Sequence, residues 1–197
     1  DFLLDAFSRQ ALPRLSDPFL FLSRGLQDAH LEISRISEAR GFDESPRTTL
    51  VACVVQDGIA YWAHAGDARL YLLRDGRIHS RTRDHTRVGQ LVDQGLLDPD
   101  KARDHPDRSK VFSCLGGSLA PQIDYSHKIA LMPGDTLALC TDGLWGPLSD
   151  TTLIDTLTRL TPMDAVPELL DTAEAEGGVD GGAGAGGGGR LRPRGRR

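Results

Sequence analysis

The sequence has few cysteines and no long hydrophobic run, and these two absences exclude several classes of protein. Its three cysteines, Cys53, Cys114 and Cys140, lie among apolar neighbours, without a cysteine or histidine at metal-ligand spacing. We interpret them as small core residues in a reducing compartment, not as a disulfide framework. No run of about 18 apolar residues is present, so no membrane span is expected. No signal peptide is recognisable either.

The length, the charge and the distribution of glycine indicate one folded domain followed by a tail. A net charge of −5 over 197 residues gives no reason to expect a nucleic-acid partner, and the length suits one domain. Residues 181–197 are mostly glycine and arginine, so we predict a domain at 1–180 and a disordered tail at 181–197, without a packed strand. A reading-frame shift in a GC-rich gene would produce such a tail. A tail that binds nucleic acid is the alternative.

Hydrophobic periodicity predicts helices at the start of the sequence. Residues 1–12 read as the end of one helix, and because the chain begins at Asp1 inside this pattern, we expect a missing N-terminal part. A second helix is predicted to be capped by Asp17, with Pro18 in its first turn. Its apolar residues recur at spacings of three and four as far as Ile36, which indicates one buried face.

Short apolar runs separated by turn residues then predict strands. Three tight turns, such as Asp57-Gly58, join four runs, which favours an antiparallel meander of four strands. Helices on both sides of the strands indicate an α+β fold. Further strands are predicted at 123–131 and 136–140, and further helices are predicted to begin at Ser149 and Pro162.

Two aspartates stand out as candidate metal ligands. Asp67 follows Gly66 in a tight turn, and Asp142 follows a strand of core character and precedes Gly143. A carboxylate at the mouth of a buried strand is costly unless it is paired, caps a helix or binds a metal. Hard cations such as Mg²⁺ and Mn²⁺ prefer oxygen ligands of this kind. Each aspartate alone can equally be a turn former or a helix cap.

Four motifs in a fixed order are more specific than either aspartate alone. They are Arg47-Thr48-Thr49, the Gly-Asp segment from Ala63 to Tyr71, Thr82-Arg83-Asp84-His85-Thr86, and Pro133-Gly134-Asp135 followed by Cys140-Thr141-Asp142-Gly143-Leu144-Trp145. Together they resemble the motifs of the PPM family, the protein phosphatase 2C type, in its bacterial form. The resemblance covers about residues 1–180.

The resemblance implies a four-layer α-β-β-α sandwich, in which two antiparallel sheets are flanked by helix pairs, incomplete in this chain. It also implies hydrolysis of phosphoserine and phosphothreonine in proteins by water bound to Mn²⁺ or Mg²⁺. The implied metal ligands are Asp67, Asp142 and Asp180, and no catalytic side chain is assigned. Residues 84–112 match a flap that influences substrate choice. The implied partners are phosphoproteins of a Ser/Thr kinase, and the implied state is a cytoplasmic monomer without nucleic acid or a membrane span.

The sequence also departs from the family pattern. The family's opening motif and its Asp-Gly-Met-Gly-Gly motif, whose aspartate bridges two metals, are absent, and Gly181 replaces the asparagine expected after Asp180. Two cations held close together need several negative ligands to offset their repulsion. We therefore expect this chain to bind Mn²⁺ weakly and to dephosphorylate poorly. The alternative function is a non-catalytic relative that binds a phosphoprotein or regulates a partner.

Overall fold

The structure, a computed structural model, describes residues 2–11, 13–102, 105–177 and 189–190. The chain divides into two compact units, one made of residues 1–67 and 84–130 and the other of residues 68–83 and 131–197. Each unit holds one antiparallel sheet with its own helices. The domain boundary predicted at residue 180 lies outside the described residues.

In the first unit the helices are α1 (Phe2–Gln10), α2 (Pro18–Arg40), α3 (Arg87–Asp93) and α4 (Pro99–Ala102), and the strands are β1 (Leu50–Gln56), β2 (Ile59–Ala65), β5 (Asp124–Tyr125) and β6 (Ile129–Ala130). In the second unit the strands are β3 (Arg69–Arg74), β4 (Arg77–Arg81), β7 (Thr136–Cys140) and β8 (Gly189–Arg190), and the helices are α5 (Asp142–Trp145), α6 (Asp150–Arg159) and α7 (Pro162–Gly177).

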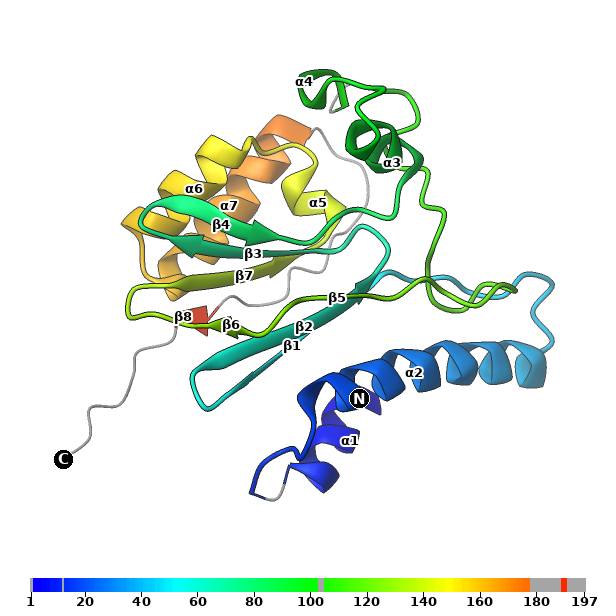
Figure 1. Cartoon of the computed structure of the whole chain (residues 1–197). Helices are drawn as coiled ribbons and strands as arrows, with labels where there is room; N and C mark the ends of the chain where they lie inside the picture. The colour runs from blue at the N-terminus through cyan, green and yellow to red at the C-terminus, as the bar shows by residue number, and fades with distance from the viewer. Residues whose placement is uncertain (1, 12, 103–104, 178–188, 191–197) are drawn as a thin grey trace. The chain divides into compact units, whose positions relative to one another are not determined.

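The long helix α2 forms as its sequence predicts and packs along the first sheet (Figure 1). The Asp17 side chain accepts a hydrogen bond from the Leu20 amide, which confirms the predicted cap. The helix ends at Arg40 and is capped by Gly41, whose φ of 64° suits a glycine. Leu22 and Leu26 are almost fully buried in the core of this unit, and each contributes about 2 kcal/mol through burial.

The first sheet is built on the β1–β2 hairpin, which turns at Asp57 and Gly58. Both β5 and β6 pair with β2, so the single strand predicted at 123–131 is two short strands. The predicted four-strand meander is wrong, because β2 and β3 belong to different sheets. The backbone groups of Gly66 bond to His85 instead of to a neighbouring strand, so the segment after β2 does not close a hairpin.

The second sheet has β3 between β4 and β7, with α6 and α7 on one face (Figure 1). Ser149 caps α6 by accepting from the Thr152 amide, and α7 begins at Pro162, so both predicted helix starts are confirmed. Leu153, Leu157 and Leu169 from these helices are buried in one core with strand residues. The helices α6 and α7 and the strand β7 of this unit therefore form where the sequence predicts them.

One prediction about the tail is wrong at two residues. Gly189 and Arg190 form β8, which pairs with Leu137 and Thr136 of β7, although no strand was expected there. Backbone amides and carbonyls pair with an available strand edge whatever the side chains are, so a side-chain pattern does not reveal such a pairing.

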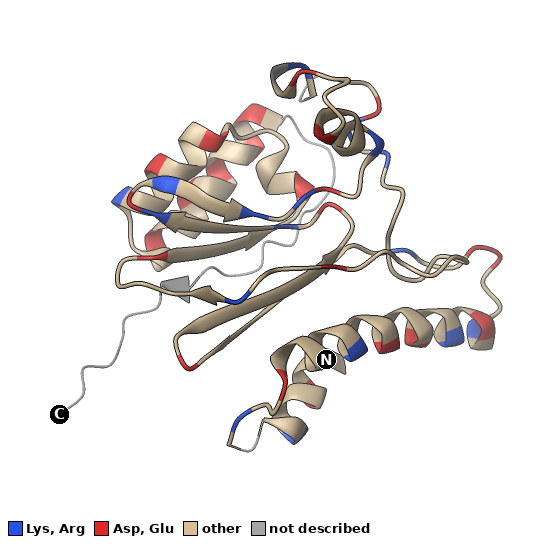
Figure 2. Cartoon of the chain, viewed as in Figure 1, with Lys and Arg blue, Asp and Glu red and all other residues tan. Residues whose placement is uncertain are grey.

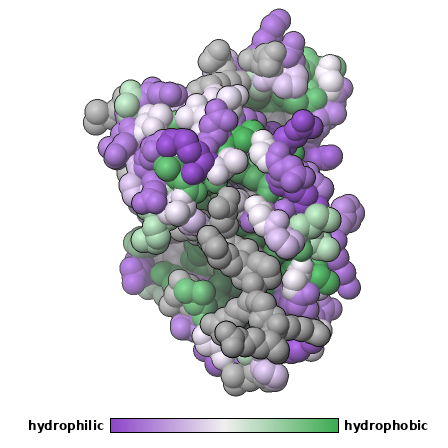
Figure 3. All heavy atoms as spheres, turned by 90° about the vertical axis from the view of Figure 1, so that its left-hand side faces the viewer, coloured by the Kyte–Doolittle hydropathy of each residue, from purple (hydrophilic) through white to green (hydrophobic). Residues whose placement is uncertain are grey.

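The surface carries charges of both signs. Acidic and basic residues alternate along the second half of α2 (Figure 2). On the face drawn in Figure 3, hydrophobic and hydrophilic side chains are interspersed. Among the described residues, no helix is both long enough and apolar enough to cross a membrane.

Candidate metal-binding site

The turn after β2 places Asp67 in a tightly packed position. Gly66 has a φ of 103°, and a Cβ atom added to it would lie 2.3 Å from Cγ2 of Thr49. The β1–β2 register pairs Leu50 with Ala65 and so brings Thr49 beside this turn. The Thr-Thr motif therefore packs on the Gly-Asp motif, and only glycine fits at position 66. The Asp67 side chain that follows is buried, with 5% exposure.

His85 holds both backbone groups of Gly66. The Gly66 amide donates to Nδ1 of His85 at 3.2 Å, and the His85 amide donates to the Gly66 carbonyl at 3.0 Å. The His85 carbonyl accepts from the Phe112 amide at 2.9 Å, so the residue is fixed on its other side as well. His85 therefore fastens the turn that carries Asp67.

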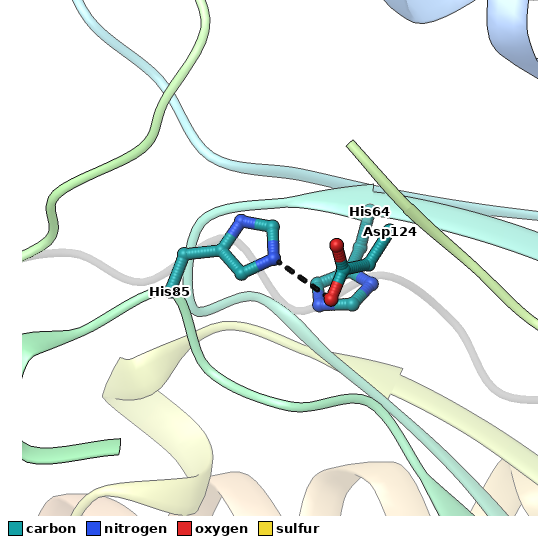
Figure 4. Close-up of side chains that lie close together, drawn as sticks. All are labelled: His64, His85 and Asp124. Atoms are coloured by element: carbon teal, nitrogen blue, oxygen red, sulfur yellow. Dashed lines mark ion pairs between the residues drawn. The ribbon is translucent and has the colours of Figure 1, made fainter. Parts of the chain in front are cut away.

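Three side chains of the first unit form a cluster beside this turn (Figure 4). The rings of His64 and His85 stack with centroids 4.7 Å apart, and both side chains are buried. The Asp124 carboxylate lies 3.4 Å from Nε2 of His85. Asp124 was missed because the sequence shows only a strand there. The pairing of Asp124 with His64 in the β2–β5 register is what brings it to the cluster.

The cluster offers a ligand atom from each residue, all within 4.8 Å of one another, which is a possible arrangement for a metal ion. Two features favour a close pairing of His85 with the Asp124 carboxylate, at 3.4 Å, instead. Because Gly66 donates to Nδ1, the proton of neutral His85 lies on Nε2, which then has no lone pair for a metal. The two ring planes are only 29° apart, so their in-plane lone pairs do not readily converge on one ion.

The charge of Asp124 is favoured by its surroundings. Burial raises the pKa of this carboxyl, but the hydrogen bond from Gln122 and the interactions with His85 and His64 outweigh burial. The pKa of Asp124 therefore lies below its ordinary value, and the group is a carboxylate at neutral pH. A carboxylate facing Nε2 stabilises the tautomer that accepts from Gly66.

In the second unit, Asp142 begins the short helix α5 directly after β7, and its side chain is exposed. The Gly146 amide donates to the Asp142 carbonyl at 2.7 Å, which closes the turn of α5. At the other end of α5, the Arg69 guanidinium lies 3.5 Å from the centre of the Trp145 ring. This contact connects β3 to the Asp-Gly-Leu-Trp segment, and Arg69 also donates to the Tyr71 hydroxyl of the same strand at 2.9 Å.

The aspartate of the Pro-Gly-Asp motif is structural. Asp135 accepts two hydrogen bonds from Arg74, at 2.9 and 2.7 Å, and one from the Met132 amide at 2.8 Å. The hydrogen bond from Arg74 is the main reason that the pKa of Asp135 lies below its ordinary value, despite burial. This pair fixes the turn that leads into β7.

The three predicted metal ligands fall in different places. Asp67 belongs to the first unit and Asp142 to the second, while Asp180 lies outside the described residues. Their convergence on one cation therefore stays a prediction. Within its own unit, each described aspartate lies two residues after the last residue of a sheet strand.

Comparison with known proteins places the chain in a family. No family model matches it. In sequence it is 36% identical, over 138 residues, to the serine/threonine protein phosphatase PstP of Mycobacterium tuberculosis, an alignment of 70% of this chain and 26% of that protein. In structure it is similar to the PPM Ser-Thr phosphatase MsPP of Mycobacterium smegmatis in complex with cacodylate, with 30% identity, a TM-score of 0.75, and coverage of 90% of this chain and 75% of that one.

The chain belongs to the PPM family of bacterial serine/threonine phosphatases. Members of this family are enzymes, and the mixed fold of helices and two antiparallel sheets confirms the predicted fold class. A further similar structure is the catalytic domain of the serine threonine protein phosphatase PstP in complex with two manganese ions, with 27% identity, a TM-score of 0.75, and coverage of 91% of this chain and 75% of that one. The chain spans about a quarter of the length of its mycobacterial sequence relative.

Proposed function

We propose that this chain is part of a domain that hydrolyses phosphoserine and phosphothreonine in proteins with the help of Mn²⁺ or Mg²⁺. The observation that carries the proposal is the Asp67 carboxylate, buried directly after a glycine turn that Thr49 and His85 hold in place. Membership of the PPM family supports the reaction, and the manganese complex of a similar structure supports the metal.

The donor chemistry of this chain fits such a metal. Asp67, Asp142 and Asp180 supply carboxylate oxygens, which Mn²⁺ and Mg²⁺ prefer. When bound, the metal lowers the pKa of a water molecule and polarises the phosphoryl group. Asp67 is buried beside a turn of fixed backbone conformation, so its carboxylate has few positions available to it. The role that we propose for this aspartate is to hold a cation at such a position.

The activity of this chain by itself is expected to be low. Its sequence contains no Asp-Gly-Met-Gly-Gly motif, so a bridging carboxylate of the family pattern is lacking among its 197 residues. Fewer negative ligands leave the repulsion between two close cations uncompensated. We expect weak Mn²⁺ binding and slow hydrolysis of a phosphothreonine peptide.

A second candidate is a domain that binds a phosphoprotein without cleaving it. The two functions differ in one measurement. A phosphothreonine peptide that binds and is recovered intact after long incubation with Mn²⁺ supports the binding function. Release of phosphate that stops when Mn²⁺ is chelated supports the hydrolytic one.

The experiment for the leading proposal combines metal binding with hydrolysis. Mn²⁺ affinity is measured by electron paramagnetic resonance, and phosphate release from a phosphothreonine peptide is followed at saturating Mn²⁺. Asp67→Asn and Asp142→Asn are each expected to weaken Mn²⁺ binding at least about tenfold, since each removes a charged ligand. The control is Asp43→Asn, at an exposed loop position. Unchanged Mn²⁺ affinity in both ligand variants would refute the proposal.

We base the proposed substrates, location and oligomeric state on membership of the family. We propose that the substrates are proteins phosphorylated by a Ser/Thr kinase in signal transduction, and that the chain acts as a cytoplasmic monomer. The measured sedimentation coefficient of the purified chain tests the monomer. Phosphoproteomics of cells that lack the gene tests the substrates, because kinase targets should gain phosphate in its absence.

A further inference from the structure

We infer that His85 and Asp124 act together as positioning residues that hold the Gly66–Asp67 turn, and with it the cation-binding carboxylate of Asp67. The inference rests on the proposed function for the role of Asp67. The hydrogen-bonded arrangement of the turn stands on its own geometry. The sequence resemblance assigned no role to Asp124.

The connection runs through the two nitrogens of one imidazole ring. On one side, Nδ1 accepts the Gly66 amide at 3.2 Å. On the other side, Nε2 is buried, makes no hydrogen bond of ordinary geometry among the described residues, and faces the Asp124 carboxylate at 3.4 Å. A ring that accepts at Nδ1 must carry its proton on Nε2, and a nearby carboxylate stabilises that tautomer. Asp124 therefore acts on Gly66 through His85.

The ring has little freedom to leave this arrangement. His64 stacks on it at 4.7 Å and Phe112 lies 5.6 Å away, both measured between ring centroids. His85 is 2% exposed, so its ring is shielded from water on the side that faces Gly66. Asp124 is itself fixed by β5 pairing with β2 and by the hydrogen bond from Gln122 at 3.0 Å. Both ends of the connection are thus anchored in the same unit.

The turn needs such support because its backbone conformation is restricted. The φ of 103° at Gly66 lies in the region that favours glycine, and a glycine is also the residue with the most conformations to lose. Asp67 is the next residue, so any rotation of the Gly66 peptide moves its carboxylate. Partners that orient a metal ligand typically change metal affinity by about 10- to 100-fold when they are removed.

The experiment uses the full chain and five variants. Four of them separate the contact of His85 with Gly66 from its contact with Asp124, and His64→Ala tests for a metal site within the cluster. Asp124→Ala removes the carboxylate, and His85→Leu removes both ring contacts. His85→Asn places an amide oxygen near the position of Nδ1, so it is expected to restore the bond to Gly66 without reaching Asp124. His127→Ala is the control, because His127 is an exposed residue between β5 and β6.

The first readout is nuclear magnetic resonance of the metal-free chain. The ¹⁵N shifts of His85 are expected to show a proton on Nε2. Hydrogen exchange of the Gly66 amide is expected to be about tenfold or more faster in Asp124→Ala and fastest in His85→Leu, with His85→Asn closer to the wild type. A proton on Nδ1 in the wild type, or Gly66 exchange unchanged in Asp124→Ala, overturns the inference.

The second readout is Mn²⁺ affinity, measured at a temperature where all variants are folded. Asp124→Ala is expected to bind Mn²⁺ about tenfold more weakly, and His127→Ala to bind like the wild type. If the wild type binds no Mn²⁺, the proposed function fails, and the exchange of Gly66 alone decides the positioning inference. Tight Zn²⁺ binding that disappears in His64→Ala overturns the inference in favour of a metal site within the cluster.

Discussion

The two turns that carry Asp67 and Asp142, one in each unit, are held in place by different kinds of contact. Asp67 is buried behind a glycine with a φ of 103°, and a histidine from a distant part of the sequence bonds its turn. Asp142 is exposed at the start of a four-residue helix, whose own backbone bond closes the turn. The first carboxylate is positioned by long-range contacts, and the second by local ones. Changes to distant residues should therefore affect Asp67 far more than Asp142.

The largest expected effect comes from Gly66→Ala. The new Cβ atom adds backbone strain and meets Thr49 at 2.3 Å, so the free energy of unfolding should fall by about 4 kcal/mol. Gly58→Ala, at the other end of β2, is the matched control: its φ is 74° but nothing lies within 4 Å, so only about 1 kcal/mol is expected. Urea unfolding measures both. Equal losses would show that Thr49 does not restrict the Asp67 turn.

The second-largest effect is expected from a change to Asp135, the structural aspartate of the second unit. Asp135→Asn removes a buried carboxylate that faces the partly buried Arg74 guanidinium, so we expect a loss of about 3 kcal/mol in the free energy of unfolding. The exposed pair of Arg81 and Asp150 is the control, and Asp150→Asn should cost less than about 1 kcal/mol. Similar losses in the two variants would contradict a special role for Asp135.

The pair of Arg74 and Asp135 is also expected to make the free energy of unfolding depend on pH. The pKa of Asp135 is lower in the folded chain, mainly through its hydrogen bond with Arg74, so its stabilisation is complete above the pKa of the unfolded chain. This stabilisation is lost as the pH falls from the pKa of Asp135 in the unfolded chain, about 3.9, through its pKa in the folded chain. Stability curves of the wild type and Asp135→Asn should therefore converge below about pH 4. A constant difference down to pH 2 would contradict this.

The smallest expected effect concerns the support of Asp142. Arg69→Met keeps the aliphatic stem but removes the contact with the Trp145 ring and the hydrogen bond to Tyr71, and about 1 kcal/mol should be lost. Arg77→Met, at an exposed position of β4, is the control. Because the turn of Asp142 is closed locally, we expect Mn²⁺ affinity to change less than in Asp124→Ala. A larger change would reverse the distinction between the two turns.

The sequence alone determined the parts of this protein that depend on near neighbours. The cap at Asp17, the hairpin at Asp57 and Gly58, the helix start at Ser149 and the ordered motifs of the PPM family were all readable, because each depends on residues a few positions apart. Only the tertiary structure decided which sheet each hairpin joins, and that Asp124 and His85 meet beside Gly66. Strand pairing and buried hydrogen bonds join residues far apart in the chain, and hydrophobic periodicity carries no information about which of them become partners.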